Sequence, residues 1–470
     1  MPKATTEQTT LWYHKKNWAI ACFLLIAATL AYALFPTRFF FLNDDFIHIP
    51  MASDGTIGHH NGARHMNDLS LYLDYLWSGD NAVGYHITNA LLHIGDILLL
   101  RLLLLKISTS LGIAIPRNVV LAMVGLFAVF AIHTEALFWI LCRTATLSML
   151  FVLLCWLFVF GAAKNSWLII PAIGCYIIAL FTYETSWLLP VYLLVWWWLS
   201  KKTLQQHRQY TWPIVAIWVV FIAYLPVRKW MIHEVIGGYE AGDIIQPNLL
   251  MIISKSARLF FRTFLPPISQ TPVMTIASCM VLLVLGILCW QILKHKLANR
   301  LWWFLLSCWL ISYLPFISLG VSATGYESDR YLYFASLFAA TWLVFSLYLL
   351  TPFYPKVSRI AIVGLFIFHG VFLVKASNDY ETAGKISAST MQLLQKNATN
   401  EQIDIYKLPA TWKGIPIFRY GFKDALNWRL DSVTAKKITV RSTSVFTGAT
   451  PRQTEHTISE KQVSIVFGQQ

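Results

Sequence analysis

Long apolar stretches separated by short polar segments dominate the pattern of this chain. A stretch of roughly 20 apolar residues is long enough to cross the ~30 Å hydrocarbon core of a membrane as a helix. We therefore predict an all-α polytopic membrane protein. The pattern indicates about eleven spanning helices, at 18–36, 85–105, 117–133, 145–163, 167–183, 185–200, 212–228, 271–293, 301–319, 331–350 and 359–375.

Basic residues gather in the short loops on one side of these predicted helices. The clusters are Lys15-Lys16, Lys201-Lys202 with Arg208, Lys294 with Lys296 and Arg300, and Lys356 with Arg359. Cytoplasmic loops carry such an excess of Lys and Arg. The sequence therefore predicts a cytoplasmic N-terminus at 1–17, a transmembrane domain over 18–375 and, because the number of spans is odd, an extracytoplasmic module over 376–470. The loops 37–84, 133–144 and 229–270 then also lie outside.

Two further segments depart from the pattern of simple spans. Residues 248–265 mix Lys255, Arg258 and Arg262 with apolar residues at helical spacing, which predicts an amphipathic helix lying in the membrane interface. The alternative is a twelfth, distorted span. The polar tail contains two short alternating stretches, 437–441 and 463–466, which predict strands. We expect the tail to form a small extracytoplasmic α+β module.

Composition agrees with a membrane protein and excludes some other classes. The chain is 57% hydrophobic and 13% charged, with 20 Trp and 20 Tyr, which are residues enriched at membrane interfaces. The formal charge of +14 is scattered over loops and tail, so we predict no nucleic-acid partner. The seven Cys residues show neither a disulfide framework nor zinc spacing. The first apolar run is long for a signal peptide, and we expect an uncleaved anchor.

The residues that can carry chemistry gather on the predicted outer side. Two adjacent carboxylates, Asp44 and Asp45, follow the first span directly. Charge near hydrocarbon is costly and is retained where it has a partner or a function. The outer ends of later spans add six more such residues: His133, Glu135, Arg143, Glu184, Asp329 and Arg330. The alternatives are a solvated loop start for the two aspartates and a structural ion pair of Glu184 with Arg143 or Arg330.

Carboxylates and arginines on one face match the needs of glycosyl transfer from a polyprenyl phosphate. A base deprotonates the acceptor hydroxyl as it attacks the anomeric carbon, and cations stabilise the departing phosphate. Arginine suits the second role because its planar fork matches phosphate oxygens. The two aspartates can also be read as ligands of a divalent cation. However, adjacent side chains of an extended loop point apart, and the sequence supplies no third ligand.

Several motifs resemble those of multi-span GT-C glycosyltransferases. The first comprises Arg64-His65-Met66 and the stretch from Gly84-Tyr85-His86 to His93. The others follow in the family's order: Ala131-Ile132-His133-Thr134-Glu135-Ala136 with Trp139 and Arg143, then Tyr183-Glu184-Thr185, then Asp329-Arg330-Tyr331-Leu332-Tyr333. The resemblance covers roughly residues 15–375. It is greatest to transmembrane O-mannosyltransferases that carry tetratricopeptide repeats and to their bacterial relatives.

The resemblance implies a catalytic carboxylate in the first outer loop, which falls on Asp44 or Asp45. It also implies a polyprenyl-phosphate sugar donor, an acceptor in the cell envelope and, given the bacterial relatives, location in the inner membrane. Substrate contacts would include Arg64, His86, His133, Glu135, Arg143, Glu184, Asp329 and Arg330. The chain departs from the family at Tyr183, where a Lys is usual, at Thr144-Ala145, where Lys-Asp is frequent, and in having no tetratricopeptide repeats.

Other functions remain open at this stage. A transporter or lipid flippase also uses buried charges in a multi-span bundle, but it predicts charges near the midplane and broken helices in paired halves. An O-antigen ligase-like enzyme predicts a large late outer loop rich in Arg and His. A non-catalytic membrane scaffold is a further alternative, but it does not explain why the chain carries Asp44, Asp45 and Glu184. The sugar, the acceptor and the oligomeric state are not determined by the sequence.

Overall fold

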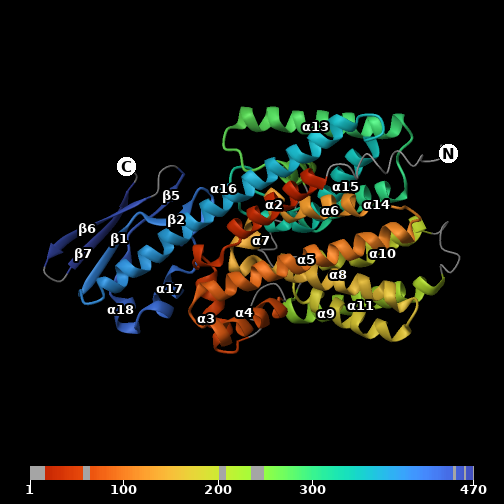
Figure 1. Ribbon diagram of the computed structural model, residues 1–470. Coiled ribbons are helices and arrows are strands. Elements are labelled where there is room, and N and C mark those ends of the chain that lie inside the picture. The colour runs from red at the N-terminus through yellow and green to blue at the C-terminus, as the bar shows by residue number, and fades with distance from the viewer. Residues whose placement is uncertain are drawn as a thin grey trace.

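A computed structural model describes residues 16–56, 64–200, 208–233, 248–447, 451–459 and 462–468. Most of them form a body of long helices, with a smaller strand-containing module at one end (Figure 1). The helices of the body are α2 (Lys16–Ala33), α5 (Ala82–Ser110), α6 (Arg117–Ala128), α8 (Thr144–Ala162), α9 (Ile169–Leu180), α10 (Leu189–Ser200), α11 (Arg208–Ile232), α13 (Thr271–Lys294), α14 (Arg300–Ile311), α15 (Tyr333–Leu350) and α16 (Pro355–Lys396).

Six helices among the described residues are long and apolar enough to cross a membrane: Arg117–Phe138, Ile140–Ala162, Gln209–Ile232, Thr271–Lys294, Asp329–Leu350 and Pro355–Lys396. The prediction of a mostly helical membrane protein is thus confirmed in outline, while the count of about eleven spans is not. Several apolar runs fold into shorter helices. For example, α9 and α10 have 12 residues each, which corresponds to about 18 Å of helix, less than the thickness of the hydrocarbon core.

Helix α15 lies at the centre of the body and packs against α6, α14 and α16. Its small residues Ala335, Ala339 and Ala340 are fully buried. Small side chains let neighbouring helices approach closely where no hydrophobic effect drives them together, as in lipid. In contrast, α13 lies at the margin of the body (Figure 1), and only 11% of its apolar window is buried.

The predicted outer loops are folded segments. Loop 37–84 contains the 3-10 turn η1 (Pro36–Arg38) and the helices α3 (Asp45–Ser53) and α4 (His65–Ser78). Loop 133–144 contains η2 (Ala131–His133), α7 (Thr134–Phe138) and η3 (Ile140–Arg143). Further turns are η4 (Ser166–Leu168), η5 (Glu184–Leu188), η7 (Leu314–Phe316) and η8 (Asp329–Leu332). These segments place the polar residues of the predicted outer side.

The predicted amphipathic helix is present as α12 (Leu249–Phe264), capped by the side chain of Asn248. Leu249 and Leu250 at its start are 70% and 75% exposed, whereas Leu259 and Phe264 near its end are buried. Its length of 16 residues corresponds to about 24 Å of helix, and it is not among the six long apolar helices. Its position in a membrane interface stays a prediction.

The C-terminal module begins later than residue 376, because α16 continues without a break to Lys396. The change of composition near 376 marks the end of the apolar part of this helix. Two sheets follow: β4-β1-β7-β6 and β3-β2-β5. Their strands are β1 (Gln402–Tyr406), β2 (Leu408–Trp412), β3 (Ile415–Pro416), β4 (Ile438–Val440), β5 (Thr443–Phe446), β6 (Arg452–Ser459) and β7 (Gln462–Gly468). The two strands predicted from alternation are β4 and β7. Helices α17 (Phe422–Arg429) and α18 (Ser432–Lys436) complete the module.

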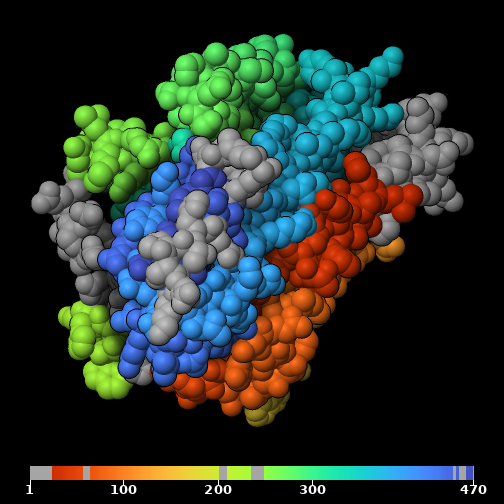
Figure 2. Space-filling view, turned by 90° about the vertical axis from the view of Figure 1, so that its left-hand side faces the viewer, coloured from red at the N-terminus to blue at the C-terminus, as the bar shows by residue number. Residues whose placement is uncertain are grey.

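The module packs onto the helical body through the segment 37–84. Phe46 of α3 stacks on Phe418 with ring centroids 5.8 Å apart, and Trp428 of α17 packs edge-on against Phe41 at 5.1 Å. A Cβ atom at Gly414 would lie 2.7 Å from the Cα of Gly325 in the segment before η8, so glycine is required at this contact. Figure 2 looks onto this end, where the module (blue) adjoins the red and orange atoms of the N-terminal third.

Candidate active site

The segment 37–84 holds its two adjacent aspartates in different environments. Asn43, which precedes them, has a φ of 44°, a left-handed conformation that Asn tolerates better than most residues. Its side-chain amide donates to Asp44 Oδ1 at 2.7 Å, and its backbone N–H donates to the carbonyl of Ile417 at 2.7 Å. Asp44 is half-buried, whereas Asp45 is 1% exposed. The loop is thus held against the module at the point where the carboxylates begin.

Asp45 is used to join two loops. Its Oδ2 accepts from the backbone N–H of Leu42, and its Oδ1 accepts from that of Leu141, both at 3.0 Å. Burial raises the pKa of Asp45 to about 8, even though both backbone hydrogen bonds act to lower it. This carboxyl is therefore largely uncharged at pH 7, and both of its oxygens are occupied by backbone groups. Asp44 is the better placed of the two to meet a substrate.

Arg330 forms an ion pair with Glu135. Its Nη1 is 2.7 Å from Glu135 Oε1, and its backbone N–H donates to Glu135 Oε2 at 3.0 Å. Ser328, with a φ of 72°, turns the chain so that its own N–H also donates to this carboxylate. The same guanidinium contacts Cys142 Sγ at 3.6 Å, and Asp44, Asp45 and Glu135 all act electrostatically on that sulfur. These residues therefore form one cluster.

The C-terminal module contributes a second arginine. Arg419 donates from Nη1 and Nη2 to the two carboxylate oxygens of Glu327, at 2.7 and 3.1 Å, which is the bidentate geometry typical of Arg. The hydrogen bond that Arg419 donates to Glu327 raises the pKa of Arg419 above its usual value, and electrostatic interactions with Glu327, Tyr420 and Asp44 add to the shift. Arg419 thus lies within electrostatic reach of Asp44. The neighbouring Tyr420 is 61% exposed and donates its backbone N–H to Asn43 Oδ1 at 2.8 Å.

A second cationic group lies around Glu184 in the turn η5. Arg64 Nη2, from the residue that precedes α4, and Arg228 Nη2, from α11, each approach this carboxylate at 3.2 Å. Burial alone would raise the pKa of Glu184, but the two guanidiniums together hold it below its ordinary value. Glu184 thus ties α11 to the start of α4 through two arginines.

The ion pair considered for Glu184 from the sequence is wrong in its partners, because Glu184 pairs with Arg64 and Arg228. Arg143 pairs with Asp74 of α4, and Asp329 pairs with Arg262 of α12. Asp329 Oδ2 also accepts from the hydroxyl of Thr134 at 3.0 Å. The partners of each pair are far apart in the sequence, at 69 and 67 positions. Local sequence patterns therefore could not predict these pairs. The Arg143 side chain is fully buried, which favours a structural role.

We expect Arg143→Ala to destabilise the protein by about 3–5 kcal/mol, because it leaves the Asp74 carboxylate buried without its cation. The thermal midpoint of detergent-solubilised protein measures the effect. The double variant Arg143→Ala/Asp74→Asn should recover part of the loss. Lys385→Ala is the matched control, since Lys385 pairs with Glu381 but is 72% exposed and should cost less than about 1 kcal/mol. A normal midpoint in Arg143→Ala would contradict the structural role.

The histidines of the predicted site are buried in the helical body. His86 packs against the ring of Phe39 with centroids 5.1 Å apart and is 3% exposed. His133 Nε2 lies 2.7 Å from the hydroxyl of Ser336 in α15. His93 lies on the same face of α5 as His86, seven positions later, and its Nδ1 is 2.7 Å from the hydroxyl of Tyr333. In this conformation these rings contact neighbouring helices instead of lining an open surface.

Sequence reasoning missed Arg419, the most informative of the added residues. It lies in the polar tail, 375 positions after Asp44, and no local motif marks it. The packing of Asn43 against the segment 417–421 is what brings it to the outer loop. Among the described residues there is no group of three or more His, Cys, Asp or Glu side chains that can hold a metal ion. No protein-family model matches the chain, and no curated protein matches it either.

Proposed function

We propose that this chain is a membrane glycosyltransferase of the bacterial inner membrane that takes its sugar from a polyprenyl-phosphate donor on the periplasmic face. The observation that carries this proposal is the half-buried carboxylate Asp44, which acts electrostatically on Arg419 and on Cys142, the residue whose sulfur Arg330 contacts at 3.6 Å, at one end of a body of long apolar helices. The resemblance to GT-C glycosyltransferases supports the same conclusion independently.

The proposed reaction divides the work between Asp44 and the arginines. Asp44 accepts the proton of an acceptor hydroxyl as its oxygen bonds to the anomeric carbon of the donor sugar. The bond between that carbon and the phosphate oxygen breaks, and its electron pair leaves with the polyprenyl phosphate. Arg330 and Arg419 stabilise the negative charge on the departing phosphate. Their carboxylate partners, Glu135 and Glu327, hold the two guanidiniums in place before substrate binds.

The distribution of charge supports a periplasmic site. The turn between α13 and α14 adjoins the turn between α15 and α16, because the rings of His295 and Phe353 stack with their centroids 3.9 Å apart. These turns carry Lys294, Lys296 and Lys356, which the positive-inside rule places in the cytoplasm. Helix α16 starts beside them and ends in the module after 42 residues, a length of about 63 Å. This exceeds the ~40–45 Å thickness of a bilayer with its headgroups, so the module would lie outside.

One observation favours a transporter or lipid flippase as the second candidate. Buried polar side chains form a network between α5 and α15, in which the Tyr333 hydroxyl contacts His93 at 2.7 Å and Asp96 at 2.9 Å. Ionisable groups inside a helical bundle often mark a transport path. The network is fully buried in this conformation, however, whereas Asp44 is partly exposed. We therefore rank glycosyl transfer first.

Mass spectrometry of lipopolysaccharide, glycolipids and envelope proteins from a deletion strain tests the function. We expect one class of molecule to lose the mass of a single sugar, with the unmodified acceptor accumulating in its place. A transporter would instead change the abundance of a molecule or its distribution between the leaflets without removing one sugar. An unchanged set of envelope saccharides under conditions in which the parent strain expresses the protein would contradict glycosyl transfer.

A further inference from the structure

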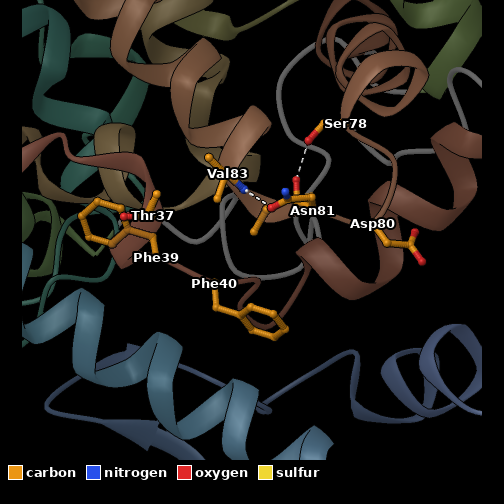
Figure 3. A pocket seen from close by; sticks show the side chains of 8 residues that line it. Thr37, Phe39, Phe40, Ser78, Asp80, Asn81 and Val83 are labelled. Atoms are coloured by element: carbon orange, nitrogen blue, oxygen red, sulfur yellow. Dashed lines mark hydrogen bonds between the residues drawn. The ribbon is translucent and has the colours of Figure 1, made fainter.

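A pocket of about 620 Å³ lies between the segment after η1 and the turn that joins α4 to α5 (Figure 3). Thr37 and Phe40 line it from one side, and Ser78, Asp80 and Asn81 line it from the other. Its volume falls within the ~300–1,000 Å³ range of small-molecule sites. The lining combines two hydroxyls, a carboxylate, an amide and an aromatic ring.

The polar groups of this pocket suit a hydroxyl-rich ligand. Asn81 caps α5 by accepting from the Val83 N–H at 3.1 Å, which uses the amide oxygen and leaves its NH₂ group outside the cap. Ser78 donates to the Asn81 carbonyl at 2.6 Å and keeps its lone pairs as acceptors. Asp80 Oδ2 is 3.6 Å from Nη1 of Arg429 in α17, so a cation of the C-terminal module partly neutralises the charge of this carboxylate. A carboxylate in the lining disfavours a phosphate and accepts hydroxyl protons.

The surface beside the pocket is apolar and exposed. Phe35, Leu76 and Trp77 are 53%, 62% and 57% exposed. Trp77 lies against the first turn of α5, where a Cβ atom at Gly84 would be 2.9 Å from its indole ring. In a chain with membrane-spanning helices, such a surface contacts lipid, and Trp is favoured at the level of the headgroups. The pocket therefore accepts a polar group whose apolar part stays in the membrane.

Two separate chain segments of similar length connect the pocket to Asp44 and limit the distance between them. Phe40 and Asp44 are four positions apart in the sequence, which allows at most about 14 Å between them. Helix α17 begins after Gly421, which touches Asn43, and ends at Arg429, which touches Asp80; its eight residues correspond to about 12 Å. The pocket and Asp44 therefore lie at the same end of the molecule, within the length of a short oligosaccharide.

We propose that this pocket binds a sugar residue of the acceptor, and that the acceptor is a glycolipid. This inference rests on the proposed function and narrows the acceptor to a saccharide with an apolar anchor. The sugar lies on the ring of Phe40 and hydrogen-bonds Asp80 and Asn81, while the anchor lies along Trp77 and Leu76. A further hydroxyl of the same glycolipid then reaches Asp44.

The test uses two photoreactive amphiphiles with the same alkyl chain. One is an alkyl glucoside with a diazirine on the sugar, and the other carries the diazirine on a phosphocholine head. We expect the glucoside to label peptides containing residues 37–40 or 78–83 of the full-length protein in detergent. Thr37→Trp places a large ring at an exposed lining position and should reduce this labelling about tenfold or more. Val83→Trp serves as a second filling variant, and Thr271→Trp, at an exposed position on α13, is the control.

Equal labelling of the pocket by both probes, or glucoside labelling unchanged in both filling variants, would overturn the proposal. The filling variants should also raise the KM for acceptor in parent-strain lipid extract while leaving kcat within a few-fold; an unchanged KM overturns the acceptor role. The proposed function fails separately if Asp44→Asn transfers sugar normally. In that case pocket-specific glucoside labelling would still identify a saccharide site, but not an acceptor site.

Discussion

Asp44→Asn should reduce sugar transfer by about 10²-fold or more while the protein inserts and folds normally. Asn keeps the shape of the side chain but cannot accept the hydroxyl proton, and a general base contributes roughly 10²–10⁴ to a rate. Because Asp44 is only half-buried and Asn keeps an oxygen that can accept from the Asn43 amide, its amide variant should keep a normal thermal midpoint. Transfer is measured in membranes supplied with lipid extract from the parent strain, and normalised to folded protein.

Asp45→Asn is the matched control for this prediction. It removes one acceptor and brings an NH₂ group against the N–H of Leu42 or Leu141, which should cost about 1–3 kcal/mol of stability. We expect fewer folded molecules with near-normal turnover per molecule. Because the pKa of Asp45 is raised to about 8 by burial, its protonated form is favoured in the folded state. Its contribution to stability is therefore largest at low pH and falls as pH rises from about 4 to about 8. Loss of turnover in Asp45→Asn with full activity in Asp44→Asn would exchange the two roles.

Arg330→Ala should reduce turnover by about 10²–10³-fold, the loss typical of one removed group that stabilises transition-state charge. Arg330→Lys keeps the charge but not the planar fork, so its activity should lie between those of the parent and the Ala variant. Arg419→Ala should show the same pattern. The matched control is Arg441→Ala, which breaks a comparable Arg–carboxylate pair elsewhere in the module, with Asp404 at 2.9 Å.

Two measurements, the yield of folded protein and the turnover per folded molecule, distinguish a phosphate contact from a structural ion pair. A purely structural Arg330 would lower the yield through the unpaired Glu135, and Arg330→Ala/Glu135→Gln would restore it. Normal turnover per folded molecule in both Arg330→Ala and Arg419→Ala would exclude the proposed phosphate contacts. Reduced turnover at a normal thermal midpoint, not restored in the double variant, is the outcome that the proposal requires.

Local patterns in the sequence predicted the parts of the fold that depend on local physics. Apolar runs marked the long helices, helical spacing of Lys255, Arg258 and Arg262 marked α12, and alternation marked β4 and β7. Breaks within apolar runs, such as the end of α6 at Ala128, leave no comparable signal. For this reason the number of spans was not predictable to the same degree.

The pairing of charges depends on long-range packing and could not be predicted. The sequence placed Arg143, Glu184, Asp329 and Arg330 on one side, but it did not reveal that Asp74, Arg228, Arg262 and Glu135 are their partners. Likewise, nothing in the tail marks Arg419 as a neighbour of Asp44. Its position follows from the hydrogen bonds that the backbone and the side chain of Asn43 form with the segment 417–420.

The most direct test of the central claim compares a deletion strain complemented with the parent gene or with Asp44→Asn. The abundance of the sugar-bearing envelope molecule is measured by mass spectrometry at matched levels of folded protein. The proposed function predicts that the parent gene restores the missing sugar and that Asp44→Asn restores about 1% of it or less under limiting expression. Full restoration by Asp44→Asn would contradict a glycosyltransferase that uses this carboxylate as its base.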